Sequence, residues 1–144
     1  MSFVPVRMNA DQIEAFVHSP RHAIVAVRRA DGLPQLSPVW YLYQEGSFYI
    51  SALIESAKCR DLQRDPRISI CIDGGHPDAR FVTIYGKAEL VKDGGPRFEE
   101  IRWRITRRYC ASDEEARQSM EEAPPSAHAM IIVAPEKMVG RDYN

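Results

Sequence analysis

Two segments in the middle of the chain alternate apolar with polar residues. The first runs over residues 68–73 and the second over residues 82–90. A two-residue period is typical of strands that bury one face. Gly86 occupies an inward position of the second segment, which predicts a bend or bulge of the kind that lets a small sheet close.

Three further strands are predicted nearer the N-terminus. They are separated by Asp31-Gly32 and Glu45-Gly46, which are turn signals between apolar runs. The strands cover His22–Arg29, Gln35–Tyr43 and Ser47–Leu53. Joined by tight turns, these strands predict a meander.

Helical periodicity replaces alternation in three places. Asn9 and Gln12 form a capping box before a short N-terminal helix that ends at Pro20. Residues 96–110 and 112–121 predict two more helices, and a last strand follows over Ala127–Ala134. The pattern is mostly β with α and predicts a small barrel of six to seven strands, a short N-terminal helix and a helical insertion before the last strand. Side chains fill so small a barrel, so a ligand must bind outside it or between subunits.

Composition narrows the class of protein. The chain has 144 residues, 44% of them apolar and 27% charged, with no repeat or linker, which predicts a single domain over residues 1–144. The chain has 19 Lys and Arg residues and 20 Asp and Glu residues, so its net charge is −1. This net charge gives no overall positive field that would attract nucleic acid. Three cysteines and no long apolar segment favour a cytoplasmic protein without a disulfide framework, a secretion signal or a membrane span.

A short helix over residues 55–66 has an unusual beginning. Ser56 caps it and Pro66 stops it, while Lys58 and Arg60 place two cations near its positive end. A bound phosphate would compensate, because Ser56, free backbone N–H groups and both cations would face one anion. The alternative is that both cations are solvated or pair with neighbouring carboxylates.

The strand over residues 35–43 contains Pro38 and three aromatic residues. Proline cannot donate to a ladder, so Pro38 marks an edge or bulge where backbone is free to meet a ligand. Trp40 and Tyr41 could supply a flat surface for a ring. Alternatively, these aromatic side chains pack on the barrel and its helices.

Other chemistry is weakly represented. The four histidines, including His128, have no metal-ligand spacing, and no nucleophile-elbow, P-loop or dinucleotide motif occurs. We therefore predict no metal site and no catalytic side chain. Cys59 is interpreted as a packing residue, with a reactive thiol as the alternative. A solvated helix face is the simplest interpretation of the four arginines Arg102, Arg104, Arg107 and Arg108.

The order of these motifs resembles the pyridoxamine 5′-phosphate oxidase-like split β-barrel family. The likeness extends from about His22 to Val91 and is most specific in Pro34-Gln35-Leu36-Ser37, in Ala57-Lys58 with Arg60, and in residues 62–67. It is strongest for the branch that uses the deazaflavin coenzyme F-420 or FMN. The resemblance implies a homodimer of split barrels with cofactor at the subunit interface.

The resemblance also implies roles for individual residues. Lys58, Arg60 and Ser51 bind the cofactor phosphate, and the tricyclic ring lies against Ser37, Pro38, Val39 and Trp40. The family usually has Asn where Asp61 stands here. A carboxylate near a phosphate is tolerable if it turns away to pair with Arg64 or Arg60.

The expected function is that of an oxidoreductase which transfers hydride between F-420 or FMN and a small conjugated organic substrate. A bound cofactor performs this chemistry, which explains the missing acid–base pair. One alternative is a non-catalytic module of the same fold that binds or stores flavin. Another is a single-strand nucleic-acid binder that stacks bases on Trp40, Tyr41 and Tyr43, which the neutral charge disfavours.

Overall fold

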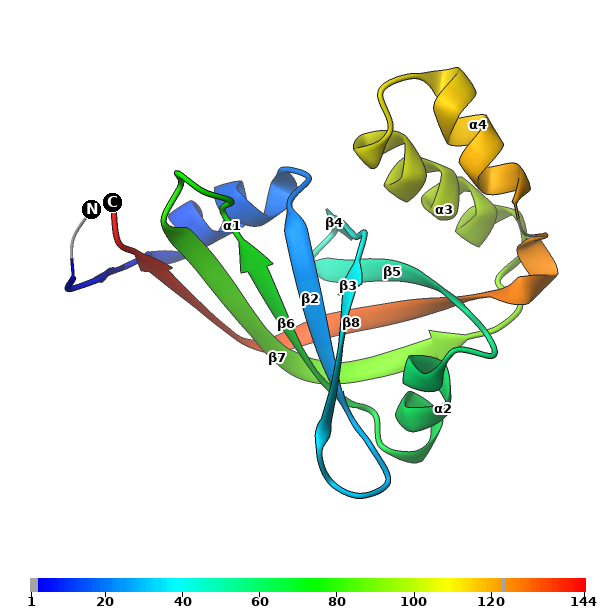
Figure 1. Cartoon of the computed structure of the whole chain (residues 1–144), viewed down its shortest axis with the longest axis horizontal. Coiled ribbons are helices and arrows are strands. Elements are labelled where there is room, and N and C mark those ends of the chain that lie inside the picture. Colours follow the sequence, from blue (N-terminus) through cyan, green and yellow to red (C-terminus); the bar gives the residue numbers. More distant parts are fainter. Residues whose placement is uncertain (1–2, 123) are drawn as a thin grey trace.

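One antiparallel sheet organises the computed structural model, which describes residues 3–122 and 124–144. Its strands are β1 (Val6–Arg7), β2 (His22–Arg28), β3 (Pro34–Val39), β4 (Leu42–Gln44), β5 (Ser47–Leu53), β6 (Arg67–Asp73), β7 (Arg80–Val91) and β8 (His128–Asp142). They lie in the order β3-β2-β6-β7-β8-β5-β4, with β1 paired to β8. The sheet curves into the expected split barrel (Figure 1). The number of strands was underestimated, because β1 was missed and one predicted strand divides into β3 and β4.

The helices begin and end close to where their capping signals place them. They are α1 (Ala10–His18), α2 (Ala57–Arg64), α3 (Gly95–Tyr109) and α4 (Asp113–Glu121), followed by a 3₁₀ turn over Pro125–Ala127. Asn9 and Gln12 form the predicted capping box at α1. Ser56 caps α2 by accepting a hydrogen bond from the backbone N–H of Cys59. Among the described residues, no helix is long and apolar enough to cross a membrane.

The last strand is longer than predicted. Pro135 is not its end, because β8 continues to Asp142. Pro135 lies opposite Gly86, where the register between β7 and β8 shifts at a bulge. The bulge accommodates a residue that cannot donate to the ladder. Gly86 is required there, since a Cβ atom would lie 2.9 Å from the carbonyl oxygen of Ala134.

Two apolar clusters stabilise the fold. The larger fills the barrel with buried side chains from every long strand and from α1 and α2. The smaller joins the outer face of the sheet to α3 and contains Leu42, Tyr49, Ile101, Ile105 and Met130. Figure 1 shows α3 and α4 together beyond β4 and β5. Packing of this second cluster holds the helical insertion against the split side of the barrel.

Candidate functional site

The site forms where the two edges of the sheet meet. Strands β3 and β4 are the two edge strands of the sheet, and the two residues Trp40-Tyr41 connect them in the sequence. The predicted continuous strand over residues 35–43 is therefore wrong at these two residues. Pro38 lies on an edge strand, as its missing N–H group predicts.

Tyr41 explains why the strand breaks. Its side chain is fully buried, and its hydroxyl lies 2.9 Å from the carbonyl oxygen of Val17 and 2.8 Å from that of Ser19, as donor. Burial raises the pKa of Tyr41 well above its usual range, so the phenol stays protonated and able to donate. The guanidinium of Arg108 donates to the carbonyl oxygens of Tyr41 and His18, both at 2.8 Å. These bonds tie α3 to the link between the two sheet edges.

Trp40 points the other way and remains 45% exposed. Its indole stacks on the ring of Tyr109 with centroids 5.2 Å apart and planes 2° apart. Tyr109 is held in turn by its hydroxyl, which donates to the carbonyl oxygen of Arg21 at 2.8 Å. The predicted flat surface therefore consists of Trp40 with Tyr109, and not of Trp40 with the buried Tyr41.

A cleft of about 400 Å³ opens beside this aromatic pair, and we name it the Trp40 cleft. It brings together five of the residues singled out in the sequence, which are Pro38, Val39, Trp40, Ser51 and Lys58. Its remaining walls come from Arg21, His22, Ala23, Ile24 and Tyr109. Among the described residues, no acidic side chain lines it, and Arg21 is paired with Asp78 at 3.6 Å. Lys58 is therefore the lysine or arginine of this lining that has no carboxylate partner in the described chain.

Lys58 is half-buried in the first turn of α2, which contains no acidic residue. Its ammonium group makes no hydrogen bond or ion pair with the part of the chain that the structure describes. An unpaired cation beside the positive end of a helix favours binding of an anion. Pairing of Lys58 with a neighbouring carboxylate therefore does not occur among the described residues, which leaves a bound anion or solvation for this side chain.

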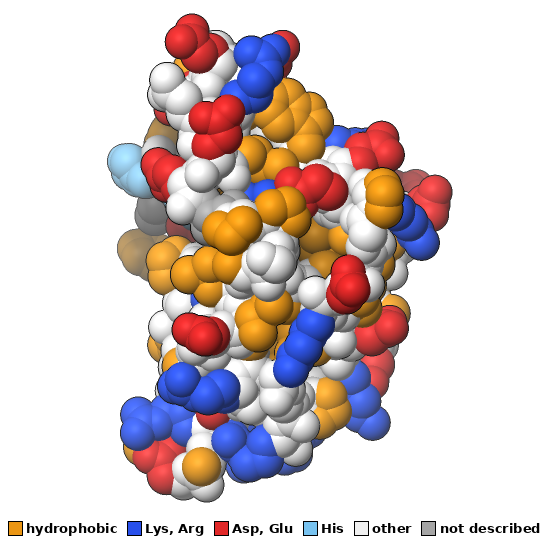
Figure 2. All heavy atoms as spheres, turned by 90° about the vertical axis from the view of Figure 1, so that its right-hand side faces the viewer, with side chains coloured by type: hydrophobic (Ala, Val, Ile, Leu, Met, Phe, Trp, Pro, Cys, Tyr) orange, Lys and Arg blue, Asp and Glu red, His pale blue; other side chains and the backbone are white. Residues whose placement is uncertain are grey.

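Arg60 opens into a different cleft of about 470 Å³, lined also by Arg29, Asp31, Gln35 and Asp61. We name it the Arg60 cleft. Residues two positions apart on a helix point to different sides, so Lys58 and Arg60 do not converge within one chain. Arg60 donates to the carbonyl oxygen of Glu55 at 3.3 Å. Figure 2 shows the molecule from the right-hand side of Figure 1. Lys and Arg side chains gather at the lower end of this view, towards the β2–β3 turn and α2 of Figure 1.

Ser37 lies on β3 between these two clefts. Its neighbours on the same face are Val39, which lines the Trp40 cleft, and Gln35, which lines the Arg60 cleft. The hydroxyl oxygen of Ser37 and the amide oxygen of Gln35 are buried, and neither finds a hydrogen-bond partner among the described residues. Buried polar atoms are nearly always paired, so both atoms are suited to meet a ligand or a partner chain.

Asp61 satisfies the condition set for it in the sequence. Its carboxylate accepts a hydrogen bond from Arg64 at 3.1 Å. It faces the Arg60 cleft and is absent from the walls of the Trp40 cleft. The charge of Asp61 is thus neutralised by Arg64 and directed away from Lys58.

The structure tests three further interpretations made from the sequence, and one of them is confirmed. The solvated face expected for the four arginines of α3 is wrong for Arg102, which is only 6% exposed and bonds to Glu99 at 2.8 Å and to the carbonyl oxygen of Met120 at 3.0 Å, whereas Arg104 is exposed as expected. Cys59 is fully buried, which confirms it as a packing residue. Tyr41 and Tyr43 are buried, so the proposed base-stacking surface for nucleic acid does not exist.

Tyr109, Arg21 and His22 were missed as site residues. Tyr109 carries a helical-period signal that indicates packing only, and Arg21 and His22 belong to no motif. Tyr109 reaches the cleft because α3 docks on the split side of the barrel, whereas Arg21 and His22 reach it from the start of β2, where Ala23 pairs with Val39 of β3. Within the described residues, no group of three or more His, Cys, Asp or Glu side chains is arranged to hold a metal ion.

Comparison with known proteins adds a family and a fold. The family model described as pyridoxamine 5′-phosphate oxidase matches residues 10–140. A conserved hypothetical protein from Mycobacterium tuberculosis superposes with a TM-score of 0.80 at 23% identity, over 100% of this chain and 91% of that one. A FAD-binding protein from Mesorhizobium loti superposes with a TM-score of 0.76 at 19% identity, over 99% of this chain and 100% of that one. A protein named F420 reductase superposes with a TM-score of 0.67 at 18% identity, over 87% of this chain and 94% of that one. At these low identities, the TM-scores establish a shared fold.

Proposed function

Because the chain belongs to the pyridoxamine 5′-phosphate oxidase family, we propose that it is an oxidoreductase which binds a flavin-type cofactor in the Trp40 cleft. The cofactor is F-420 or FMN, and hydride passes between it and a small conjugated organic substrate. Two structural neighbours support a flavin-type cofactor, since one is named F420 reductase and the other a FAD-binding protein.

One observation carries the proposal. Lys58, which has no partner among residues 3–122 and 124–144, lines the same cleft as the flat Trp40–Tyr109 pair, and no carboxylate of these residues lines it. A cofactor of this class has a phosphate at one end and a planar ring at the other. The cleft offers a cation for the first and an aromatic wall for the second, so its residues fit the group.

Lys58, Ser51 and Ser56 would bind the phosphate. Lys58 supplies the charge, and the first N–H groups of α2 add the positive end of the helix. The hydroxyl of Ser56 accepts from the N–H of Cys59 and can still donate its own hydrogen. Arg60 opens into the neighbouring cleft and would act on this phosphate through its charge, without the direct contact proposed for Lys58.

Pro38, Val39 and Trp40 would hold the ring. Ser37 stays in the proposed set of ring residues, although it does not line this cleft and its hydroxyl oxygen is buried. Pro38 has no N–H group and β3 is an edge strand, so backbone carbonyls there are free of a neighbouring strand. Trp40 is fixed by Tyr109, and Tyr109 by the carbonyl oxygen of Arg21. These contacts give the ring a rigid wall.

When bound, the cofactor supplies the hydride chemistry. The chain binds the phosphate at Lys58, orients the ring against Val39 and Trp40, and excludes water from the covered face of the ring. We assign no side chain as an acid or base.

We further propose that two copies of the chain assemble around the site. Apolar side chains near it remain exposed, including Ile24, Leu36 and Leu53. Leu36 belongs to edge strand β3, whose outer side has no neighbouring strand in this chain. A second copy would cover these side chains and close the Trp40 cleft.

Two experiments test the function. Fluorescence or absorbance titration with F-420 and with FMN measures cofactor binding, and we expect saturable binding of at least one. Consumption of the reduced cofactor in the presence of quinones, enones and tetrapyrroles then tests turnover. Binding without consumption of any of these would indicate the non-catalytic binding module instead.

A further inference from the structure

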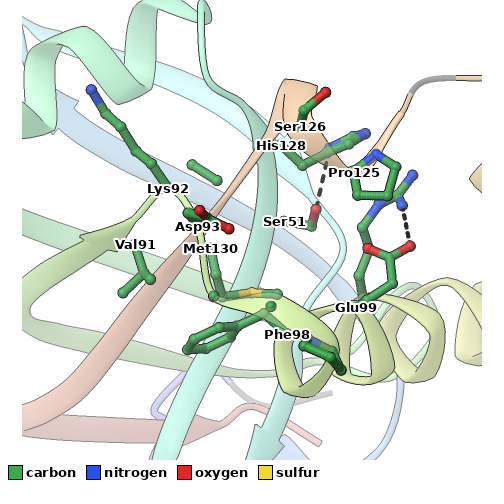
Figure 3. A pocket seen from close by; sticks show the side chains of 15 residues that line it. Ser51, Val91, Lys92, Asp93, Phe98, Glu99, Pro125, Ser126, His128 and Met130 are labelled. Atoms are coloured by element: carbon green, nitrogen blue, oxygen red, sulfur yellow. Dashed lines mark hydrogen bonds and ion pairs between the residues drawn. The ribbon is translucent and has the colours of Figure 1, made fainter.

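A second cleft of about 510 Å³ begins at Ser51, the residue that also lines the Trp40 cleft. It lies between the start of α3 and the neighbouring ends of β5, β7 and β8 (Figure 3). We name it the His128 cleft. Ser51 and Met130 are paired across β5 and β8, and His128 follows on the same face. The two clefts therefore share Ser51, one of the proposed phosphate residues.

His128 is the polar centre of this cleft. Its Nδ1 atom lies 3.4 Å from the hydroxyl oxygen of Ser51, and Figure 3 shows the two side chains pointing toward one another. Its Nε2 atom is buried and finds no hydrogen-bond partner among the described residues. Burial lowers the pKa of His128, which favours the neutral ring. A neutral ring that bonds Ser51 through Nδ1 keeps Nε2 available for a ligand.

The other walls suit an organic group. Val91, Phe98 and Met130 supply apolar surface, and Phe98 provides an aromatic face. Arg102 and Glu99 neutralise each other at 2.8 Å, while Lys92 and Asp93 add one charge of each sign. A mainly apolar cleft with a few directed polar atoms is typical of a small-molecule site.

We propose that the His128 cleft receives a group attached beyond the cofactor phosphate, so that the protein selects a cofactor that continues past this phosphate over one that ends there. This inference rests on the proposed function, which places the phosphate at Lys58 and Ser51. FMN ends at its phosphate and leaves the His128 cleft empty. F-420 and FAD both continue past the phosphate, the first with a lactyl-glutamyl tail and the second with an adenylate.

The Arg60 cleft is the competing route for such a group. Its lining contains two arginines, Arg29 and Arg60, and two aspartates, Asp31 and Asp61. It does not include Ser51, so a phosphate held by Ser51 and Lys58 has the His128 cleft as its direct continuation. Variants of the two clefts separate these routes.

The test is equilibrium titration of the full chain with FMN, FAD and F-420. Ser126 is exposed at the edge of the His128 cleft, so Ser126→Trp fills the cleft without entering the core, and Ser126→Ala is its matched control. Arg29→Ala probes the Arg60 cleft. We expect the parent to bind FAD or F-420 at least tenfold more tightly than FMN. Ser126→Trp should remove that advantage and leave the FMN affinity within twofold.

Other outcomes overturn the inference. The first is equal affinity of the parent for all three cofactors. The second is a Ser126→Trp variant that still prefers FAD or F-420 over FMN, or that loses affinity for all three cofactors equally. The third is loss of this preference in Arg29→Ala instead. The cofactor of the two, FAD or F-420, that the parent binds more tightly than FMN identifies the attached group. Failure of the parent to bind any of the three would contradict the proposed function itself, whereas FMN binding with no advantage for the larger cofactors contradicts this inference alone.

Discussion

Trp40 and Tyr109 stack with their ring planes 2° apart, which places the last residue of α3 against the link between the two edges of the sheet. The contact makes the helical insertion a wall of the cleft. Because Tyr109 is anchored to Arg21, the stack also connects α3 to the start of β2.

Replacing Tyr109 should separate the two functions of its side chain. Tyr109→Phe keeps the stack and loses one hydrogen bond, so we expect a loss of about 1 kcal/mol in unfolding free energy and unchanged cofactor affinity. Tyr109→Ala removes the stack and should cost roughly 2–4 kcal/mol and weaken cofactor binding. Urea unfolding and cofactor titration of both variants provide the measurements. Equal cofactor affinity in Tyr109→Ala would exclude Tyr109 from the site.

Trp40→Ala tests whether the indole orients the ring. We expect turnover to fall by about tenfold to hundredfold through misplacement of the ring, while phosphate contacts retain most of the cofactor affinity. Steady-state rates with reduced cofactor measure the effect. The thermal midpoint must stay within a few degrees of the parent, because a large drop would attribute the loss to folding. Unchanged turnover in a folded variant would contradict this role.

The capped helices and meander strands could be predicted from the sequence because short-range interactions determine them. Asn9 meets Gln12 within one turn, and Ser56 meets the N–H of Cys59 within another. Features that depend on distant residues could not be predicted in the same way. Strand β8 passes Pro135 because the register shift opposite Gly86 leaves Glu136 as an extra residue on β8, and the burial of Arg102 is tolerated because Glu99 and the carbonyl oxygen of Met120 accept its hydrogen bonds.

The candidate site follows the same division. Lys58 stood out because a cation in the first turn of a helix conflicts with the helix dipole, which is a local rule. Its separation from Arg60 follows from helix geometry, yet the resemblance to a family gave both residues one role. Tyr109 enters the cleft only through the docking of α3, for which the sequence has no short-range signal, whereas Arg21 lies there through the pairing of β2 with β3 and belongs to no motif.

Asp78 should make folding stability depend on acid pH. Hydrogen bonds from the Arg80 side chain hold the pKa of Asp78 well below its usual range. A depressed folded-state pKa contributes stability above the unfolded value, near 4, and that contribution is lost as the pH falls below it. We expect Asp78→Asn to lower the unfolding free energy by about 1 kcal/mol at pH 7, and the difference from the parent to shrink below about pH 4. A difference that is constant from pH 7 to pH 3, measured by urea unfolding, would contradict this.

The proposed dimer predicts the mass in solution. Sedimentation equilibrium at micromolar concentration should give twice the chain mass of 16.4 kDa. Leu36 is 64% exposed on edge strand β3, so Leu36→Glu should shift the equilibrium toward monomer without lowering the thermal midpoint of the monomer itself. A parent chain that stays monomeric while it binds cofactor tightly would contradict the dimer.

Cofactor titration of the parent, Lys58→Ala and Arg60→Ala tests the central claim most directly. We predict saturable binding of F-420 or FMN by the parent and a loss of about 1.5–3 kcal/mol in Lys58→Ala, the usual size of a charge-assisted hydrogen bond to a desolvated anion. Arg60→Ala should lose less, because Arg60 opens into the neighbouring cleft. Folding stability of Lys58→Ala should barely change, since Lys58 has no partner among the described residues and opposes the helix dipole. Absence of cofactor binding by the parent, or unchanged affinity in a folded Lys58→Ala variant, would contradict a cofactor site in the Trp40 cleft.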